Sequence, residues 1–336
     1  MSGRGAAGGP ARRRVTMTTV GRMAGVSQVT VSRALSDPSK VSPDTLARIR
    51  EAIEATGFVP NALAGALASS RSRLVSALVP SITNIVYASM IQSFSEGMRA
   101  GGYQILLSET GFDPEEEAAV AAAHLSRRPD AILLTGIHHG AGTRRMLLGA
   151  GIPVVEVWDL TNSPLDVCVG FSHVDAGRAV AAFAREAGYA RAGAISAGDE
   201  RARRRRDAFA QAFGAPVERA DLPGAASLAG GREGLSHLLS SGFREGVVFC
   251  SSDLLAQGAL VEAHARGLDV PRDVAVIGFG DQGFAAHMEP ALTTVRVDRE
   301  ALGMAAAEAL LARIDGRDVP QARVDVGFEI VRRGSA

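Results

Sequence analysis

The chain has 336 residues, which is long enough for two or three separate cores, and it has no apolar run long enough to cross a membrane. Its two cysteines, Cys168 and Cys250, lie far apart in apolar stretches, which argues against a disulfide framework and predicts reduced, buried thiols. The net charge of zero hides a partition: residues 1–73 hold 11 Lys and Arg against 4 Asp and Glu, net +7, which leaves net −7 for residues 74–336. A basic head on an acidic body is typical of a DNA-binding module joined to a part that does not contact phosphates.

Residues 1–14 are rich in Gly, Ala and Arg and lack the apolar stretch of a secretory signal, so we expect a disordered arm and a cytoplasmic protein. The first predicted helix spans residues 18–24, where Val20 and Met23 form an apolar i, i+3 stripe. Gly25 ends it, because the tight turn that follows needs a positive φ. A flexible basic tail would show no such pattern.

The second predicted helix spans residues 28–35 and is capped by Ser27. We expect Val31 and Leu35 to face inward and the remaining positions, Gln28, Val29, Ser32 and Arg33, to face outward. Two helices joined by a three-residue turn with Gly form a helix-turn-helix, whose second helix enters the major groove. Gln and Arg on that helix bind base edges in bidentate fashion.

A third helix is predicted to start at Ser42 and Pro43, and it completes the small core with Leu46, Ile49, Ile53 and Phe58. The Ala-rich segment 61–68 then follows a proline and is too short to be a stable helix alone in water. It is either a linker helix or a helix that forms on DNA, with Leu67 wedged into the minor groove.

The body alternates apolar runs with Ala-rich stretches, which predicts parallel strands separated by helices. The predicted strands are residues 74–80, 104–107, 131–135, 153–157, 167–171, 192–196, 246–250 and 274–278. The predicted helices lie near residues 85–100, 114–127, 142–150, 174–187, 202–213, 229–241 and 253–266. This rhythm predicts two doubly wound lobes, with a ligand bound in the cleft beyond the carboxyl ends of the strands.

Two motifs suggest other chemistry. Residues 278–283 match G-x-G-x-x-G after a strand, but a further strand at 292–297 leaves no room for the long helix of a dinucleotide site. His138 and His139 have no carboxylate or Cys at ligand spacing, so a solvated loop is favoured over a metal site. With no catalytic signature visible, we expect neither an enzyme nor a cofactor or metal.

Several motifs resemble the lac-repressor/galactose-repressor family at the family's own spacing: Val15-Thr16, Ala24-Gly25-Val26-Ser27, Thr30-Val31-Ser32-Arg33-Ala34-Leu35, Val41-Ser42, Gly57-Phe58-Val59-Pro60-Asn61 and Ala62-Leu63-Ala64. The resemblance covers nearly all of residues 15–333. It implies a recognition helix at 28–35, a hinge helix at 61–68 and a core similar to periplasmic sugar-binding proteins. The DNA-binding residues it implies, together with the helix pattern, are Thr16, Ser27, Gln28, Val29, Thr30, Ser32, Arg33, Asn61, Ala64 and Leu67. Thr19 and Gly21 depart from the family pattern, and we expect them to weaken the first helix by up to about 1 kcal/mol.

One arginine of the run 201–206 is expected to point into the cleft, where its fork of donors would bind sugar hydroxyls or a carboxylate. The family resemblance selects Arg205. Segments 79–84, 151–156, 169–171, 199–201 and 288–290 look most like the gluconate-operon repressor branch, which implies a sugar-acid effector. The other candidate ligand residues are Ser81, Asn84, Tyr87, Glu156, Trp158, Phe171, Ser172, Arg201, Ser252, Asp253 and Asp281.

Three points stay open at this stage. Trp158 is either a stacking platform for the ligand or a core residue. Ser252-Asp253 stands where the family has Asn-Asp, and Gly280-Asp281 where it has Asp-Asp, so a hydroxyl-binding carboxylate is missing or shifted by one residue. The effector either induces, by closing the lobes and releasing DNA, or corepresses.

The predicted organisation is a small all-α head on an α/β core of two doubly wound lobes. It comprises an arm (1–14), a DNA-binding domain (15–60), a hinge helix with linker (61–73) and a ligand-binding core (74–336). The N-lobe takes about 74–172 plus 299–327, and the C-lobe about 173–298 plus 328–333. We expect a homodimer on double-stranded operator DNA, with no membrane partner. The rivals are an exported solute-binding protein, which would lack the basic head, and a nucleotide-dependent sugar-acid enzyme.

Overall fold

The computed structural model describes residues 15–59 and 71–336. The chain forms two compact units, and the boundary between them falls between Ser72 and Arg73. The predicted arm (1–14) and the predicted hinge helix (61–68), with Asn61, Ala64 and Leu67, lie outside the described residues. Among the helices that are described, none is both long enough and apolar enough to span a bilayer.

The head consists of α1 (Met17–Ala24), α2 (Gln28–Ser36), the one-turn 3-10 helix η1 (Pro38–Lys40) and α3 (Pro43–Thr56). These match the three predicted helices within one or two residues. As predicted, Gly25 ends α1 with a φ of 66°, and Ser27 caps α2 by accepting a hydrogen bond from the Thr30 amide. Thr19 forms a capping box with Thr16, so the substitution that was expected to weaken α1 still satisfies the helix terminus.

The core of the head corrects two predictions. Met23, which was placed on an apolar stripe with Val20, is 57% exposed, and Leu35, which was expected to face inward, is 38% exposed. Their neighbours Ala24 and Ala34 are buried instead, beside Val20 and Val31. Small alanines at these positions let three short helices approach closely, and the remaining core side chains are Ile49, Ala52 and Phe58, of which Ile49 and Phe58 were predicted.

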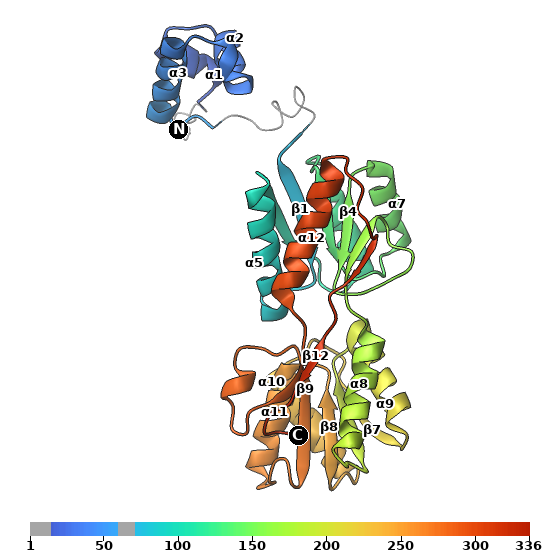
Figure 1. The fold of residues 1–336 in the computed structure, drawn as a ribbon. Coiled ribbons are helices and arrows are strands. Elements are labelled where there is room, and N and C mark those ends of the chain that lie inside the picture. The colour runs from blue at the N-terminus through green and yellow to red at the C-terminus, as the bar shows by residue number, and fades with distance from the viewer. Residues whose placement is uncertain (1–14, 60–70) are drawn as a thin grey trace, which may run out of the picture. The chain divides into compact units, whose positions relative to one another are not determined.

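The N-lobe is built on a six-stranded parallel sheet in the order β11-β5-β4-β3-β1-β2. Its strands are β1 (Leu74–Val79), β2 (Gln104–Glu109), β3 (Ala131–Thr135), β4 (Val154–Val157), β5 (Val167–Gly170) and β11 (Arg323–Asp325). Figure 1 shows α5 (Ile85–Ala100) and α12 (Arg299–Ile314) side by side on this lobe, where they pack together. The other two helices, α6 (Pro114–Leu125) and α7 (Ala141–Ala150), also pack on each other.

Strand alternation divides the N-lobe core into two layers. Val155 and Val157 of β4 belong to the cluster that includes Phe94 of α5 and Leu302 of α12. On the other face of the sheet, Ile132 and Leu134 of β3 pack with Ala121 of α6 and Leu147 of α7. Because successive side chains of a strand point to opposite faces, the sheet is covered on both sides, as a doubly wound sheet requires.

The C-lobe repeats this architecture with a sheet in the order β12-β10-β9-β8-β6-β7, in which only β12 runs antiparallel to its neighbour. Its strands are β6 (Ala192–Ser196), β7 (Val217–Asp221), β8 (Gly246–Cys250), β9 (Val274–Phe279), β10 (Thr293–Arg296) and β12 (Glu329–Val331). Its helices are α8 (His173–Glu186), α9 (Glu200–Phe213), α10 (Leu228–Ser240) and α11 (Asp253–Ala265). Strand β7 was not predicted from the sequence, because it is partly exposed and has no continuous apolar run.

Three segments of chain connect the lobes, between β5 and α8, between β10 and α12, and between β11 and β12. The glycine-rich residues 278–283 end β9 and are followed only by a one-turn 3-10 helix, η2 (Ala285–His287), before β10. This is the shortage of space that the sequence predicted. Both cysteines are free and buried, also as predicted, and burial raises the pKa of both thiols.

Candidate functional site

The outer face of α2 carries the side chains that were predicted to recognise DNA. Gln28, Val29, Ser32 and Arg33 are exposed, as predicted, and Val29 is 66% exposed although it is apolar. Thr18 of α1 donates a hydrogen bond from Oγ1 to Gln28 Oε1 at 3.0 Å, which orients the amide of Gln28. The helix therefore offers a fixed amide, an isopropyl group and a guanidinium, the groups that contact adenine, the thymine methyl and guanine in the major groove.

A cavity of about 230 Å³ lies between the two lobes, where loops at the carboxyl ends of both sheets meet. The N-lobe contributes residues that follow β1, β2 and β4, and the C-lobe contributes residues that follow β6, β7, β8 and β9. The side chains on its wall that carry polar atoms are Ser81, Thr83, Asn84, Tyr87, Trp158, His173, Asp199, Arg201, Arg205, Ser251, Ser252 and Gln282. The site is thus small, polar and assembled from both lobes.

Arg205 on α9 is the most tightly held of these side chains. It is 6% exposed, its Nη2 donates to the Ser251 carbonyl at 2.8 Å, and its Nη1 donates to His173 Nδ1 at 2.9 Å. Its guanidinium also lies 3.9 Å from the centre of the Phe279 ring. Burial lowers the pKa of Arg205 to about 10, which leaves the side chain charged at neutral pH.

His173 is kept neutral to receive this hydrogen bond. Its Nε2 donates to the Trp158 carbonyl at 2.8 Å, so Nδ1 carries the lone pair that accepts from Arg205. Burial, and after it the positive charge of Arg205, hold the pKa of His173 well below its ordinary value. The Trp158 carbonyl therefore sets the tautomer of His173, and that tautomer orients the guanidinium of Arg205.

The cavity has an excess of hydrogen-bond donors. Arg205 Nε, Arg201 Nη1 and Trp158 Nε1 are buried and meet no acceptor among the described residues. In the same part of the chain no carboxylate lies within ion-pair distance of either arginine, and Arg201 donates only to the Tyr87 hydroxyl, at 2.9 Å. Each buried donor left without a partner costs about 1–3 kcal/mol, so the wall is complementary to a ligand rich in oxygen acceptors and negatively charged.

Comparison with known proteins places both units. Residues 16–61 match the family described as bacterial regulatory proteins, lacI family, and residues 181–336 match the periplasmic binding protein-like domain. The HTH-type transcriptional regulator GntR of Pseudomonas aeruginosa is 37% identical over 96% of this chain and 96% of its own length. The chain belongs to the LacI family. It is a DNA-binding transcriptional regulator, as its relatives are, and not an enzyme.

Solved structures support the same assignment. A LacI-family transcriptional regulator from Silicibacter pomeroyi superposes with a TM-score of 0.90 at 32% identity, over 96% of this chain and 99% of that one. The regulator GntR from Chromobacterium violaceum gives a TM-score of 0.75 at 35% identity, over 78% of this chain and 98% of that one. The predicted head and two-lobed α/β core are therefore confirmed for this LacI-family regulator.

The structure brings seven of the twelve predicted ligand residues onto the wall of one cavity: Ser81, Asn84, Tyr87, Trp158, Arg201, Arg205 and Ser252. Both interpretations of Trp158 describe part of its position, since it is 3% exposed and packs edge-on against Tyr87 and Phe171 while also lining the cavity. Phe171 and Ser172 lie behind the wall. Phe171 is fully buried against Trp158 and His173, and Ser172 caps α8.

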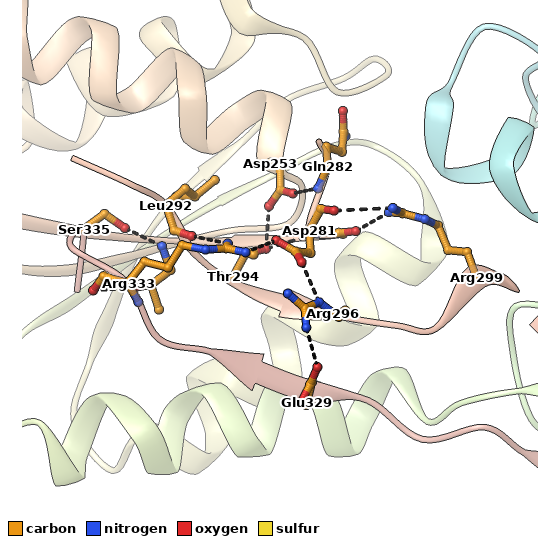
Figure 2. A network of polar contacts seen from close by, with 12 residues as sticks. Asp253, Asp281, Gln282, Leu292, Thr294, Arg296, Arg299, Glu329, Arg333 and Ser335 are labelled. Atoms are coloured by element: carbon orange, nitrogen blue, oxygen red, sulfur yellow. Dashed lines mark hydrogen bonds and ion pairs between the residues drawn. The ribbon is translucent and has the colours of Figure 1, made fainter. Parts of the chain in front are cut away.

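Three predicted ligand carboxylates are turned away from the cavity, which corrects their assignment. Glu156 is buried in the N-lobe, where it accepts a hydrogen bond from the Leu165 amide at 2.7 Å. Asp253 is buried and accepts from the Gln282 amide at 2.6 Å and from the Thr294 hydroxyl. Figure 2 shows how Asp253 and Asp281 lie in one network around the loop that follows β9.

Asp281 is held by arginines from the end of β10, the start of α12 and the residues after β12 (Figure 2). Its carboxylate accepts from Arg296 Nε at 2.6 Å and pairs with Arg333 Nη2 at 2.7 Å, while Arg299 donates to the Gly280 and Asp281 carbonyls. Asp281 also lines a separate open cavity of about 840 Å³ beside α5. The contacts of Asp281 with Arg296 and Arg333 tether the loop that carries Gln282 to the end of β10 and to the residues after β12.

Seven polar or aromatic residues of the cavity wall were not predicted from the sequence: Thr83, Phe112, His173, Asp199, Ser251, Phe279 and Gln282. Each lies at or beyond the carboxyl end of a strand, so the rule that placed the cleft was the available signal. That rule predicts which edge of the sheet carries the site. The direction of each side chain depends on the conformation of its loop, which the rule does not predict.

His139 corrects the prediction of a solvated loop. Its side chain is 1% exposed, its Nδ1 lies 3.0 Å from Glu117, and its Nε2 lies 3.4 Å from Glu156. Burial lowers the pKa of His139, but hydrogen bonds and charge attraction from the two glutamates outweigh burial and raise it to about 9. His138 beside it is exposed, as predicted, and pairs with Glu200 across the cleft at 3.0 Å.

This buried cluster predicts a pH-dependent stability of the core. The pKa of His139 in the folded state, about 9, exceeds 6.5 in the unfolded chain, so its contribution is complete below pH 6.5 and is lost as the pH rises through 9. We expect a loss of at most about 3 kcal/mol. Urea unfolding followed by the fluorescence of Trp158, the only tryptophan, measures it at pH 6.5 and 9.5. His139→Gln should remove most of the pH dependence and His138→Gln should not; equal slopes for both variants would contradict the assignment.

Proposed function

We propose that this LacI-family regulator is a cytoplasmic repressor that binds operator DNA as a homodimer and is released by a sugar acid such as gluconate. The observation that carries the ligand class is the charged, buried guanidinium of Arg205, which no carboxylate neutralises in the described part of the chain. A buried charge without a partner is costly, and a ligand carboxylate would supply the missing counter-charge. The donors of Arg201 and Trp158 would bind the remaining oxygens of the ligand.

The carboxylate of Asp199 on the same wall offsets this charge only in part, because it attracts Arg205 without lying within ion-pair distance of it. Its Oδ1 accepts the hydrogen bond of the Ala202 amide as the N-cap of α9. The cavity therefore presents two guanidiniums against one carboxylate that is already engaged. A neutral sugar of the same size would leave Arg205 without a carboxylate in direct contact, which is why we favour an acid.

The proposed DNA contacts come from the helix-turn-helix and from the predicted hinge segment: Thr16, Ser27, Gln28, Val29, Thr30, Ser32, Arg33, Asn61, Ala64 and Leu67. Each head contributes one α2, and two copies of the chain would place two recognition helices in successive major grooves of a pseudo-palindromic site. The hinge residues Asn61, Ala64 and Leu67 stay a prediction.

Arg33→Ala is expected to weaken binding to the operator by roughly 1–3 kcal/mol if this exposed guanidinium binds a base. The operator is obtained by selection from random DNA with the full-length protein, and affinity is measured by fluorescence anisotropy on that site and on a scrambled site. Arg50→Ala, an exposed arginine on α3, is the control. Loss of affinity by Arg33→Ala that is equal on both DNAs would make Arg33 a phosphate contact and not a base contact.

The proposed function as a whole is tested by titrating gluconate and sorbitol into the complex of the full-length protein with this operator. We expect gluconate to release DNA at concentrations where sorbitol has no effect. Tighter DNA binding with gluconate would replace induction by corepression. No response to either compound would reject the proposed effector class and leave the DNA-binding assignment intact.

A further inference from the structure

The loop that follows β9 decides which groups of this edge of the sheet reach the ligand cavity. Gly280 has a φ of 126°, a backbone conformation that residues other than Gly rarely adopt. A residue with a side chain at position 280 would therefore be strained in this loop as it stands.

The two aspartates close to this loop are both committed elsewhere (Figure 2). Asp281 turns toward Arg296 and Arg333, and Asp253 binds the Gln282 backbone amide and the Thr294 hydroxyl. Neither lines the cavity. The network thus removes negative charge from the cavity wall and fixes the backbone of Gln282 at the same time.

Gln282 is what this loop contributes to the cavity. It is 6% exposed, its side chain lines the wall, and Figure 2 shows that side chain pointing away from the aspartate network. The amide group of its side chain makes no hydrogen bond to any residue that the structure describes; only its backbone takes part in hydrogen bonds. A neutral amide offers both a donor and an acceptor, and it adds no charge beside Arg201 and Arg205.

We propose that Gln282 is a specificity-determining residue, whose amide keeps this part of the wall neutral so that the cavity accepts a sugar acid in preference to the neutral polyol. A carboxylate at this place would compete with the ligand for the two guanidiniums and repel its negative charge. Asp253 and Asp281 act as positioning residues, because they hold the loop that presents the amide. The inference rests on the proposed sugar-acid function.

The test is the isosteric substitution Gln282→Glu in the full-length protein, with calorimetric titration of gluconate and competition by sorbitol. We expect the variant to bind gluconate more weakly, on the order of tenfold or more, and the ratio of gluconate to sorbitol affinity to fall. Gln282→Met, which removes the amide without adding charge, should weaken gluconate binding less than Gln282→Glu does. Gln211→Glu on the exposed face of α9 makes the same change of charge away from the cavity and should leave the ratio unchanged.

The outcomes separate the two proposals. Wild-type protein that binds gluconate in preference to sorbitol, together with an unchanged ratio in Gln282→Glu, overturns the role of Gln282 alone. Equal losses in Gln282→Met and Gln282→Glu also overturn it, since they indicate packing and not charge. Wild-type protein that binds neither compound rejects the proposed effector class, and the inference with it. Thermal unfolding of each variant establishes that it is folded.

Discussion

Replacing Arg205 by alanine is expected to abolish the response of this regulator to gluconate while sparing its affinity for DNA. Removal of one partner of a buried charge pair costs roughly 2–5 kcal/mol, about 30-fold or more in affinity. The effect should be large because this guanidinium is buried, is charged at neutral pH and is oriented by His173, Ser251 and Phe279 before any ligand arrives. A preorganised donor loses little entropy on binding.

Calorimetry with gluconate and anisotropy with operator DNA measure the two properties separately. Arg205→Lys keeps the charge but loses the fork, so it should retain an intermediate affinity for gluconate. Arg178→Ala removes an exposed arginine of α8 and serves as the control. Gluconate binding by Arg205→Ala at wild-type affinity would reject Arg205 as the ligand anchor, and loss of DNA binding as well would indicate a folding defect.

The wall of the cavity was predictable wherever a residue's place in the sheet decides its position. Residues just beyond the carboxyl ends of parallel strands meet in one cleft, and that rule accounts for Ser81 and Ser252, whereas the family resemblance selected Arg205. Glu156 shows how a second rule was overlooked. Its neighbours Val155 and Val157 pack in the cluster with α5 and α12, so strand alternation already directs Glu156 to the opposite face.

Other positions depend on contacts that no local pattern contains. Asp281 has a φ of 44°, and its carboxylate is directed by Arg296 and Arg333, which belong to segments near the end of the chain. His139 is buried because Glu117 and Glu156, from two other elements, meet it in space. Spacing along the sequence reports only neighbours in the chain, so both residues were assigned to the wrong surroundings.

Helix α9 links the two lobes through three side chains of its first half. Arg201 donates to Tyr87, Glu200 pairs with His138 and Arg204 pairs with Asp159, and each partner belongs to the N-lobe. Arg205, on the same helix, is the proposed ligand anchor. A ligand that binds Arg205 therefore acts on a C-lobe helix that also contacts the N-lobe. It can shift the equilibrium between open and closed lobes only by as much as its affinities for the two forms differ.

Arg204→Ala is expected to destabilise the core by about 3–5 kcal/mol, because it leaves a buried carboxylate without its cation. The Asp159 side chain is 1% exposed, and its other hydrogen bond is donated by the Leu160 amide. Burial raises the pKa of Asp159 and the charge of Arg204 lowers it, so removing Arg204 should raise the folded-state pKa further. A carboxyl with a raised folded-state pKa favours the protonated form on folding, so the destabilisation should shrink as the pH falls toward the folded-state pKa and below it.

Urea unfolding followed by Trp158 fluorescence at pH 7.5 and 5.5, conditions chosen to span this change, measures the loss and its pH dependence. The double variant Asp159→Asn with Arg204→Met removes both charges and should recover much of the stability, since replacing a whole buried pair is far less costly than breaking it. It should still bind gluconate more weakly than wild type even though Arg205 is intact, because the contact between the lobes is gone. A single variant as stable as wild type at pH 7.5 would mean that Asp159 reaches solvent and that this pair does not hold the lobes together.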